Sequence, residues 1–172
     1  MTSKIRIADI IQAEFGTFSG YRFRTKLADS VLFIIAPLIL GVAAYLWAPP
    51  VYAVGSVLSG VTVFTALLVA LLVNVFNFSV KIRRDEKIRP EEPLSITVNE
   101  LMANAAWAVL VGLVLVILLV AAAATQVPSC AINTLWVGVL VLVFLHLMAC
   151  VLMVISRIWT AHEQIKDLPP KR

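Results

Sequence analysis

The hydrophobic positions of this chain fall into two long stretches that no formal charge interrupts. Residues 30–80 contain no Asp, Glu, Lys or Arg, and residues 101–156 contain none either. A membrane-spanning helix needs roughly 20 apolar residues, because each adds about 1.5 Å across a hydrocarbon core about 30 Å thick. Each stretch is too long for one crossing and long enough for two. We therefore expect each stretch to fold back once as a helical hairpin.

Proline marks a turn near the middle of each stretch. Pro49 and Pro50 interrupt the first stretch and Pro128 interrupts the second, and proline lacks the backbone donor that a continuing helix needs. Aromatic residues flank both turns, as expected for rings at the level of the lipid headgroups: Trp47, Tyr52 and Trp136. The pattern thus predicts four spans, at 29–48, 52–79, 102–125 and 134–157.

The basic residues predict which way the spans run. All 14 Lys and Arg residues lie in three segments, 4–26, 81–89 and 157–172, and neither turn contains one. Basic loops remain on the cytoplasmic side of a membrane, so we expect both termini and the middle loop to be cytoplasmic. The predicted fold class is an all-α, multi-pass protein of the cell (inner) membrane, with four transmembrane helices arranged as two hairpins.

Composition supports this class. The chain is 61% hydrophobic and 14% charged, whereas soluble domains are about 45–50% apolar and about 25% charged. A soluble domain of this size would leave too much apolar surface in water. Lipid removes that difficulty, so we interpret the two stretches as membrane-embedded.

Cytoplasmic segments complete the predicted organisation. Residues 1–28 contain an amphipathic helix at 4–18, which lies along the lipid surface or packs against another cytoplasmic segment. Residues 80–101 form a loop in which Thr97 and Glu100 have the capping-box spacing that predicts a helix start. The remaining segments are the two hairpins and the cytoplasmic tail, at 29–79, 102–157 and 158–172.

The spans offer one candidate ionisable group for ion or proton chemistry, His146. It lies 11 residues before Arg157, which places it about 16 Å into the membrane, near the midplane. A histidine there senses pH, gates a pore or binds a metal, or it is a neutral ring bonded to a neighbouring span. We favour the neutral ring, because we expect no second His, Cys or carboxylate at the same depth.

Amides and hydroxyls are the other polar groups of the spans. Three asparagines are expected at similar depth near the cytoplasmic ends of spans two and three: Asn74, Asn77 and Asn104. They bond between helices or subunits, or they form a polar ring at the inner mouth of a pore. One face of span two is small and weakly polar, and it suits close helix packing or a narrow aqueous path: Gly55, Ser59, Thr62, Ala66, Val73 and Asn77.

Two basic clusters are candidate contacts for anionic lipids. They are Arg22, Arg24 and Lys26 before the first span, and Lys81, Arg83 and Arg84 after the second. Each basic residue near an anionic surface contributes about 1 kcal/mol, although these charges also hold the loops inside. Nucleic-acid binding is not supported, because acidic residues are mixed in nearly evenly.

The patterns of soluble enzymes are missing from the sequence. His162 and Glu163 are not followed by a second histidine at the spacing of a zinc helix, and no glycine-rich phosphate loop occurs. We expect no catalysis, no cofactor and no metal site. Ion-coupled transport is disfavoured, because the spans hold no coupling carboxylate.

The four-span plan resembles that of small membrane proteins that act as pore-forming effectors in bacterial defence systems. The resemblance lies in architecture and covers no specific motif. Four spans without internal charge are too few to enclose a pathway alone, so the leading hypothesis is a homo-oligomer that changes membrane permeability. Its cytoplasmic helices would receive a signal or a protein partner. The alternative is a non-catalytic subunit that anchors or scaffolds a larger membrane complex.

Overall fold

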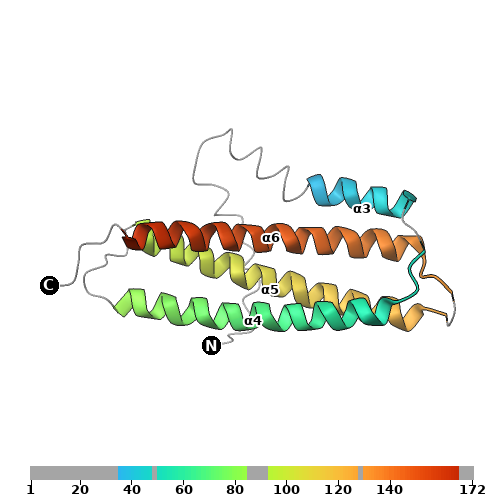
Figure 1. The fold of residues 1–172 in the computed structure, drawn as a ribbon, viewed down its shortest axis with the longest axis horizontal. Coiled ribbons are helices and arrows are strands. Elements are labelled where there is room, and N and C mark those ends of the chain that lie inside the picture. The colour runs from blue at the N-terminus through green and yellow to red at the C-terminus, as the bar shows by residue number, and fades with distance from the viewer. Residues whose placement is uncertain (1–34, 48–49, 85–92, 128–129, 167–172) are drawn as a thin grey trace, which may run out of the picture.

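The computed structural model describes residues 35–47, 50–84, 93–127 and 130–166, and these residues are helical with short connections (Figure 1). The four helices are α3 (Ala36–Trp47), α4 (Val54–Arg84), α5 (Pro93–Thr125) and α6 (Thr134–Lys166). No strand occurs among the described residues. The amphipathic helix predicted at 4–18 lies outside them, as do Arg22, Arg24 and Lys26 and residues 29–34 of the first predicted span.

Three of the helices are long and apolar enough to cross a membrane. α4 has 31 residues, and α5 and α6 have 33 each. At 1.5 Å per residue they are about 46–50 Å long, which exceeds a hydrocarbon core of about 30 Å. α3 has 12 residues and is about 18 Å long. The described part of the first predicted span is therefore shorter than one crossing.

The charges of the described helices gather at one end of the array. α4 ends there at Arg84, α5 begins at Pro93 and α6 ends at Lys166, all on the left of Figure 1. We call this the charged end, and its charged residues are Lys81, Arg83, Arg84, Glu100, Arg157, Glu163 and Lys166. The opposite, uncharged end holds the start of α4 and α6 and the end of α5. This alternation matches the antiparallel threading that the charge pattern predicts.

The helices lie in the spatial order α4–α5–α6–α3. α5 packs against both α4 and α6, while α3 packs against α6 and makes no contact with α4 (Figure 1). The second predicted hairpin is thus a packed pair of antiparallel helices. The arms of the first are separated by that pair, which the sequence did not predict.

The connection from α3 to α4 crosses the uncharged end of the array. The Ile132 amide donates a hydrogen bond to the Val51 carbonyl at 3.0 Å. The Gln126 side-chain nitrogen donates to the Tyr52 carbonyl at 3.0 Å and to the Cys130 carbonyl at 3.1 Å. These bonds satisfy backbone groups that the turns leave outside helices. They join the two turns of the chain to each other.

The start of α5 differs from the prediction. The helix begins at Pro93, and Thr97 is buried one turn inside it with 6% exposure. Proline suits the first helical position, because its missing amide hydrogen would have no helical partner there and its backbone angle is already helical. The prediction that Thr97 caps this helix is therefore wrong.

Apolar side chains from α4, α5 and α6 form the core. The main cluster surrounds Leu115 and Leu119 of α5 and Leu147 of α6, each with at most 1% exposure. A smaller cluster at the charged end joins all three helices, through Ile82, Leu94, Val98 and Ala161. α5 lies at the centre of both clusters, so it fixes the relative positions of its two neighbours.

Glycine permits the close crossing of α3 and α6. A Cβ atom added at Gly41 would lie 2.7 Å from the Cβ of Leu142, and one added at Gly138 would lie 2.9 Å from the Cβ of Tyr45. Real Cβ atoms do not approach so closely, so neither position accepts a side chain without movement of a helix. Small residues at crossings let membrane helices gain contact through their backbones.

Candidate functional site

The small and weakly polar face predicted on α4 points away from the other helices. Its six residues are all exposed: Gly55, Ser59, Thr62, Ala66, Val73 and Asn77. We call these residues the α4 face. In contrast, the exposed residues in the middle of α5 and α6 are large and apolar, such as Ile117 and Ile155. The α4 face is thus the most polar surface at membrane level among the described helices.

The hydroxyl groups of the α4 face donate to their own helix. Ser59 donates to the Gly55 carbonyl at 3.0 Å, and Thr62 donates to the Leu58 carbonyl at 2.8 Å. These bonds satisfy the hydroxyl hydrogens in an apolar setting. The oxygen lone pairs remain able to accept a hydrogen bond. The face is therefore compatible with lipid in one copy, and it can also contact water or a donor.

The structure does not gather the three asparagines on one surface. Asn74 and Asn77 are exposed on α4, whereas Asn104 of α5 is 1% exposed. Neither the nitrogen nor the oxygen of the Asn104 amide has a hydrogen-bond partner within the described part of the chain. A buried amide without a partner is energetically unfavourable. The polar ring and the interhelical bonds considered for these residues stay predictions.

His146 lies half-buried on α6 beside Cys150. Its Nε2 atom is 3.8 Å from the Cys150 Sγ atom, one helical turn away. The expectation that no cysteine lies at its depth is wrong, because residues four apart share a helix face. That spacing was visible in the sequence. No group of three His, Cys, Asp or Glu side chains suited to a metal occurs in the described residues.

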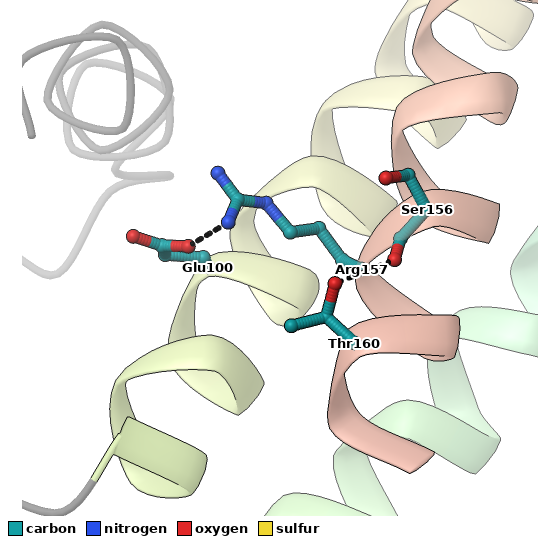
Figure 2. Close-up of polar contacts among 4 residues, drawn as sticks. All are labelled: Glu100, Ser156, Arg157 and Thr160. Carbon is teal, nitrogen blue, oxygen red and sulfur yellow. Dashed lines mark hydrogen bonds and ion pairs between the residues drawn. The ribbon is translucent and has the colours of Figure 1, made fainter. Parts of the chain in front are cut away.

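Polar bonds link the helices at the charged end. Figure 2 shows the Arg157 guanidinium of α6 reaching across to the Glu100 carboxylate of α5, with Nη1 and Oε2 2.7 Å apart. These side chains are 32% and 25% exposed. In the same view, the Thr160 hydroxyl donates to the Ser156 carbonyl within α6. The ion pair fixes the charged ends of α5 and α6 side by side.

The basic run at the end of α4 curves around the side of the helix that faces away from the buried Ile82, with Arg84 between Lys81 and Arg83. Lys81, Arg83 and Arg84 are all exposed, but Ile82 between them is buried. Successive residues of a helix are about 100° apart, so Lys81 and Arg83 lie on opposite sides of Ile82. The Arg83 guanidinium donates to the Asn99 side-chain oxygen of α5 at 2.8 Å. Contact of these residues with anionic lipid stays a prediction.

Two apolar hollows lie between α4 and α6, with α5 as their floor. One has a volume of about 250 Å³ toward the uncharged end, where Val57, Leu119 and Phe144 contribute to its lining. The other has a volume of about 280 Å³ and lies at the charged end. We call the second one the charged-end groove, and it is lined by Asn74, Val75, Phe78, Leu101, Ile158, Ala161, His162 and Ile165. Sequence reasoning missed both, because hydrophobic periodicity does not show which helices are neighbours.

Comparison of this chain with protein families, with curated proteins and with solved structures found no match. Its function is therefore argued from its own geometry. The features that constrain it are the α4 face, the pair formed by His146 and Cys150, and the two hollows between α4 and α6.

Proposed function

We propose that this chain is a non-catalytic membrane protein that assembles as a homo-oligomer and alters membrane permeability, as a channel or pore-forming effector. One observation carries the proposal. The α4 face is small and weakly polar, and none of the described residues of a single copy covers it. In a ring of copies with α4 toward the central axis, this face lines the axis.

A single copy offers no polar pathway within its described helices. The space between α4, α5 and α6 is filled by apolar side chains around Leu115 and Leu147. The hollow toward the uncharged end is lined by apolar residues alone. Ions cross a membrane only where polar groups or water replace their hydration shell. Conduction by this protein would therefore need several copies.

Small residues on the α4 face favour contact between copies. Gly41 and Gly138 demonstrate that glycines of this chain support very close helix crossings. By contrast, a Cβ atom added at Gly55 or at Gly60 of α4 would have no atom within 4 Å. The outer half of α4 therefore has the composition of a packed membrane interface without a packing partner.

The lining of such a pathway would be neutral. Ser59 and Thr62 contribute hydroxyl oxygens, and Asn77 contributes an amide near the charged end. None of the six residues of the α4 face is charged, but Arg84 follows Asn77 by seven residues and so lies on the same side of α4 at the charged end. Charge rings are what give many pores their ion selectivity. We therefore propose a neutral path with a ring of arginines at its charged end.

The full topology is part of the proposal. α3 together with the residues before it forms a fourth span, and both termini lie in the cytoplasm of a cell whose inner membrane holds the protein. The distribution of basic residues supports this orientation. Reporter tags placed at Pro50 and at Pro90 should be found on opposite faces of the membrane. Detection of both tags on the same face would contradict the topology.

Flux through liposomes tests the proposed function. Purified full-length protein should release ions from sealed vesicles, and Thr62→Leu with Asn77→Leu should lower the rate about tenfold by making the path apolar. Ala124→Leu is the matched control, since Ala124 is a small exposed residue of α5, and it should leave flux unchanged. Absence of flux, together with absence of toxicity on overexpression, would refute the proposal.

A scaffold role is the second candidate. The α4 face would also accept a helix from a different membrane protein, because close packing needs only small residues. The mass of the purified assembly separates the two cases. Multiples of 18.8 kDa support the homo-oligomer, whereas a larger co-purifying subunit supports the scaffold.

A further inference from the structure

The charged-end groove combines an apolar channel with polar groups at its mouth. Phe78 of α4 and Ile158 of α6 form opposite walls, and Leu101 of α5 lies at the floor. The lining includes two side chains with polar atoms, Asn74 and His162. The groove has a volume of about 280 Å³. This is too small for a whole helix, which is about 10–12 Å wide with its side chains. Its shape suits a flexible apolar chain.

Two lysines lie close to the mouth of this groove by their positions on α4 and α6. Ile82 and Ala161 belong to one packed cluster, so their sequence neighbours Lys81 and His162 lie at the same level on α4 and α6. Lys81 is on the same side of Ile82 as Phe78, which lines the groove. Lys166 follows His162 by one turn of α6 and is exposed. The apolar groove thus ends at a rim that attracts anions.

The two acidic residues that the described helices carry at this end are both engaged. The Glu163 carboxylate accepts a hydrogen bond from the Trp159 indole at 3.0 Å. Glu100 pairs with Arg157 at 2.7 Å. Within the described helices, neither Lys81 nor Lys166 forms an ion pair. The described acidic residues therefore do not neutralise the two lysines of the rim.

We propose that the charged-end groove binds one anionic phospholipid, with an acyl chain between α4 and α6 and the phosphate headgroup at Lys81, His162 and Lys166. The groove lies where the apolar stretches of all three helices give way to charge, which is the level of lipid headgroups. Basic pockets between membrane helices are a recognised setting for anionic headgroups. The binding does not depend on the proposed permeability function.

Lipid titration with paired variants tests the headgroup. Dioleoyl phosphatidylglycerol should bind the full-length protein in neutral detergent, as counted by native mass spectrometry, while dioleoyl phosphatidylcholine should bind more weakly. Lys81→Gln with Lys166→Gln should weaken binding about 30-fold, which is about 1 kcal/mol for each basic residue. Arg83→Gln with Arg84→Gln is the comparison variant, since it removes equal charge from predicted contacts of bulk lipid that do not line the groove, and in detergent it should weaken binding of one lipid clearly less than the lysine pair does.

Three outcomes of this titration would overturn the proposal. Equal loss in both paired variants would mean diffuse attraction of lipid to a basic surface. Equal binding of the two lipids would exclude recognition of the anionic headgroup. Displacement of the lipid by millimolar inorganic phosphate would show that the acyl chain contributes nothing, so the ligand would be a free anion.

A second measurement tests the acyl chain without reducing the charge. Ile158→Trp should fill the groove and abolish lipid binding, whereas Ile155→Trp, at an exposed position of the same helix, should not. A photo-crosslinking phenylalanine analogue placed at Ile158 should form an adduct with phosphatidylglycerol. An adduct with a second copy, or with residues 1–34 of the chain itself, would assign the groove to that occupant and refute the lipid.

Discussion

The crossing of α3 with α6 and the α4 face are built from similar residues but differ in what covers them. At the crossing, Gly41 and Gly138 face each other so closely that an added Cβ would meet a neighbour within 3 Å. On α4, an added Cβ at Gly55 or Gly60 would meet no atom within 4 Å. One surface is a completed helix contact and the other is an open one.

This difference shows that a pattern of small residues indicates that a helix can pack closely, but not which helix it packs against. The pattern on α4 was visible in the sequence, and no described residue of a single copy packs on it. The glycines of α3 and α6 gave no comparable signal, because each helix holds only one. Contact between them required the array to place α3 on α6. Substitutions at the two surfaces should therefore have opposite consequences.

The largest expected effect is the loss of the α3–α6 contact. Gly138→Leu should lower the free energy of unfolding by about 3 kcal/mol or more, because the new side chain has to push α3 away from α6. Gly55→Leu is the matched control on the α4 face, where an added Cβ atom meets no described atom within 4 Å, and it should leave the monomer as stable as the parent. Thermal unfolding in mild detergent measures both. Equal destabilisation by the two changes would show that the two surfaces do not differ in how they are packed.

The next effect concerns the Asn104 amide, which is buried on α5. Asn104→Leu should raise the free energy of unfolding by about 2 kcal/mol, because it removes a buried amide that has no partner among the described residues. Leucine has nearly the same shape and no polar atoms. If Asn104→Leu instead lowers the free energy of unfolding, the amide is hydrogen-bonded in the native protein, for example within an oligomer. Repeating the measurement on the separated monomer locates that bond.

A smaller effect is expected where α4 meets α5. A Cβ atom added at Gly112 would lie 3.1 Å from Oγ1 and 3.2 Å from Cγ2 of Thr65. Gly112→Ala alone should therefore cost about 1 kcal/mol, and adding Thr65→Ala should relieve it. A double-mutant cycle on thermal stability should give a favourable coupling between the two changes. Strict additivity would mean that the helices separate without penalty.

The smallest effect is at the charged end. Glu100→Gln should lower the free energy of unfolding by about 0.5 kcal/mol, because water partly screens the ion pair with Arg157. The exchange of charges, Glu100→Arg with Arg157→Glu, should restore most of this loss. The effect should diminish at high salt. A larger loss that salt does not change would indicate that the pair is more deeply buried than its exposure suggests.

Charge-free length and proline placement were sufficient to predict α4, α5 and α6. Their approximate extents follow from solvation by lipid, which each segment satisfies on its own. That six small or weakly polar residues share one face of α4 followed from their helical spacing, but their exposure in a single copy did not. Helix neighbours were not predictable in this way, because lipid and protein are equally apolar environments for a leucine. For that reason the pairing of α3 with α6 and the charged-end groove emerged only from the structure.

Short sequence motifs gave two wrong predictions, one for the start of α5 and one for the surroundings of His146. The spacing of Thr97 and Glu100 fits a cap, but Pro93 lies four residues earlier and is itself a favourable helix start. His146 and Cys150 are four residues apart on one helix. The prediction for His146 considered only its depth in the membrane and overlooked that the two side chains share a helix face. Both errors came from treating one motif without its neighbours on the same helix.

The placement of α3 also imposes an order on biogenesis. Gly41 leaves the ribosome 97 residues before Gly138, so the earliest described helix waits for the last one before it can dock. During that interval neither α4 nor α5 covers the Gly41 side of α3, because α3 packs on α6 alone among the described helices. The hydrogen bonds between the two turns, from Ile132 to Val51 and from Gln126 to Tyr52, then close behind it. Completion of α6 is thus the step at which the nascent polypeptide acquires its final arrangement.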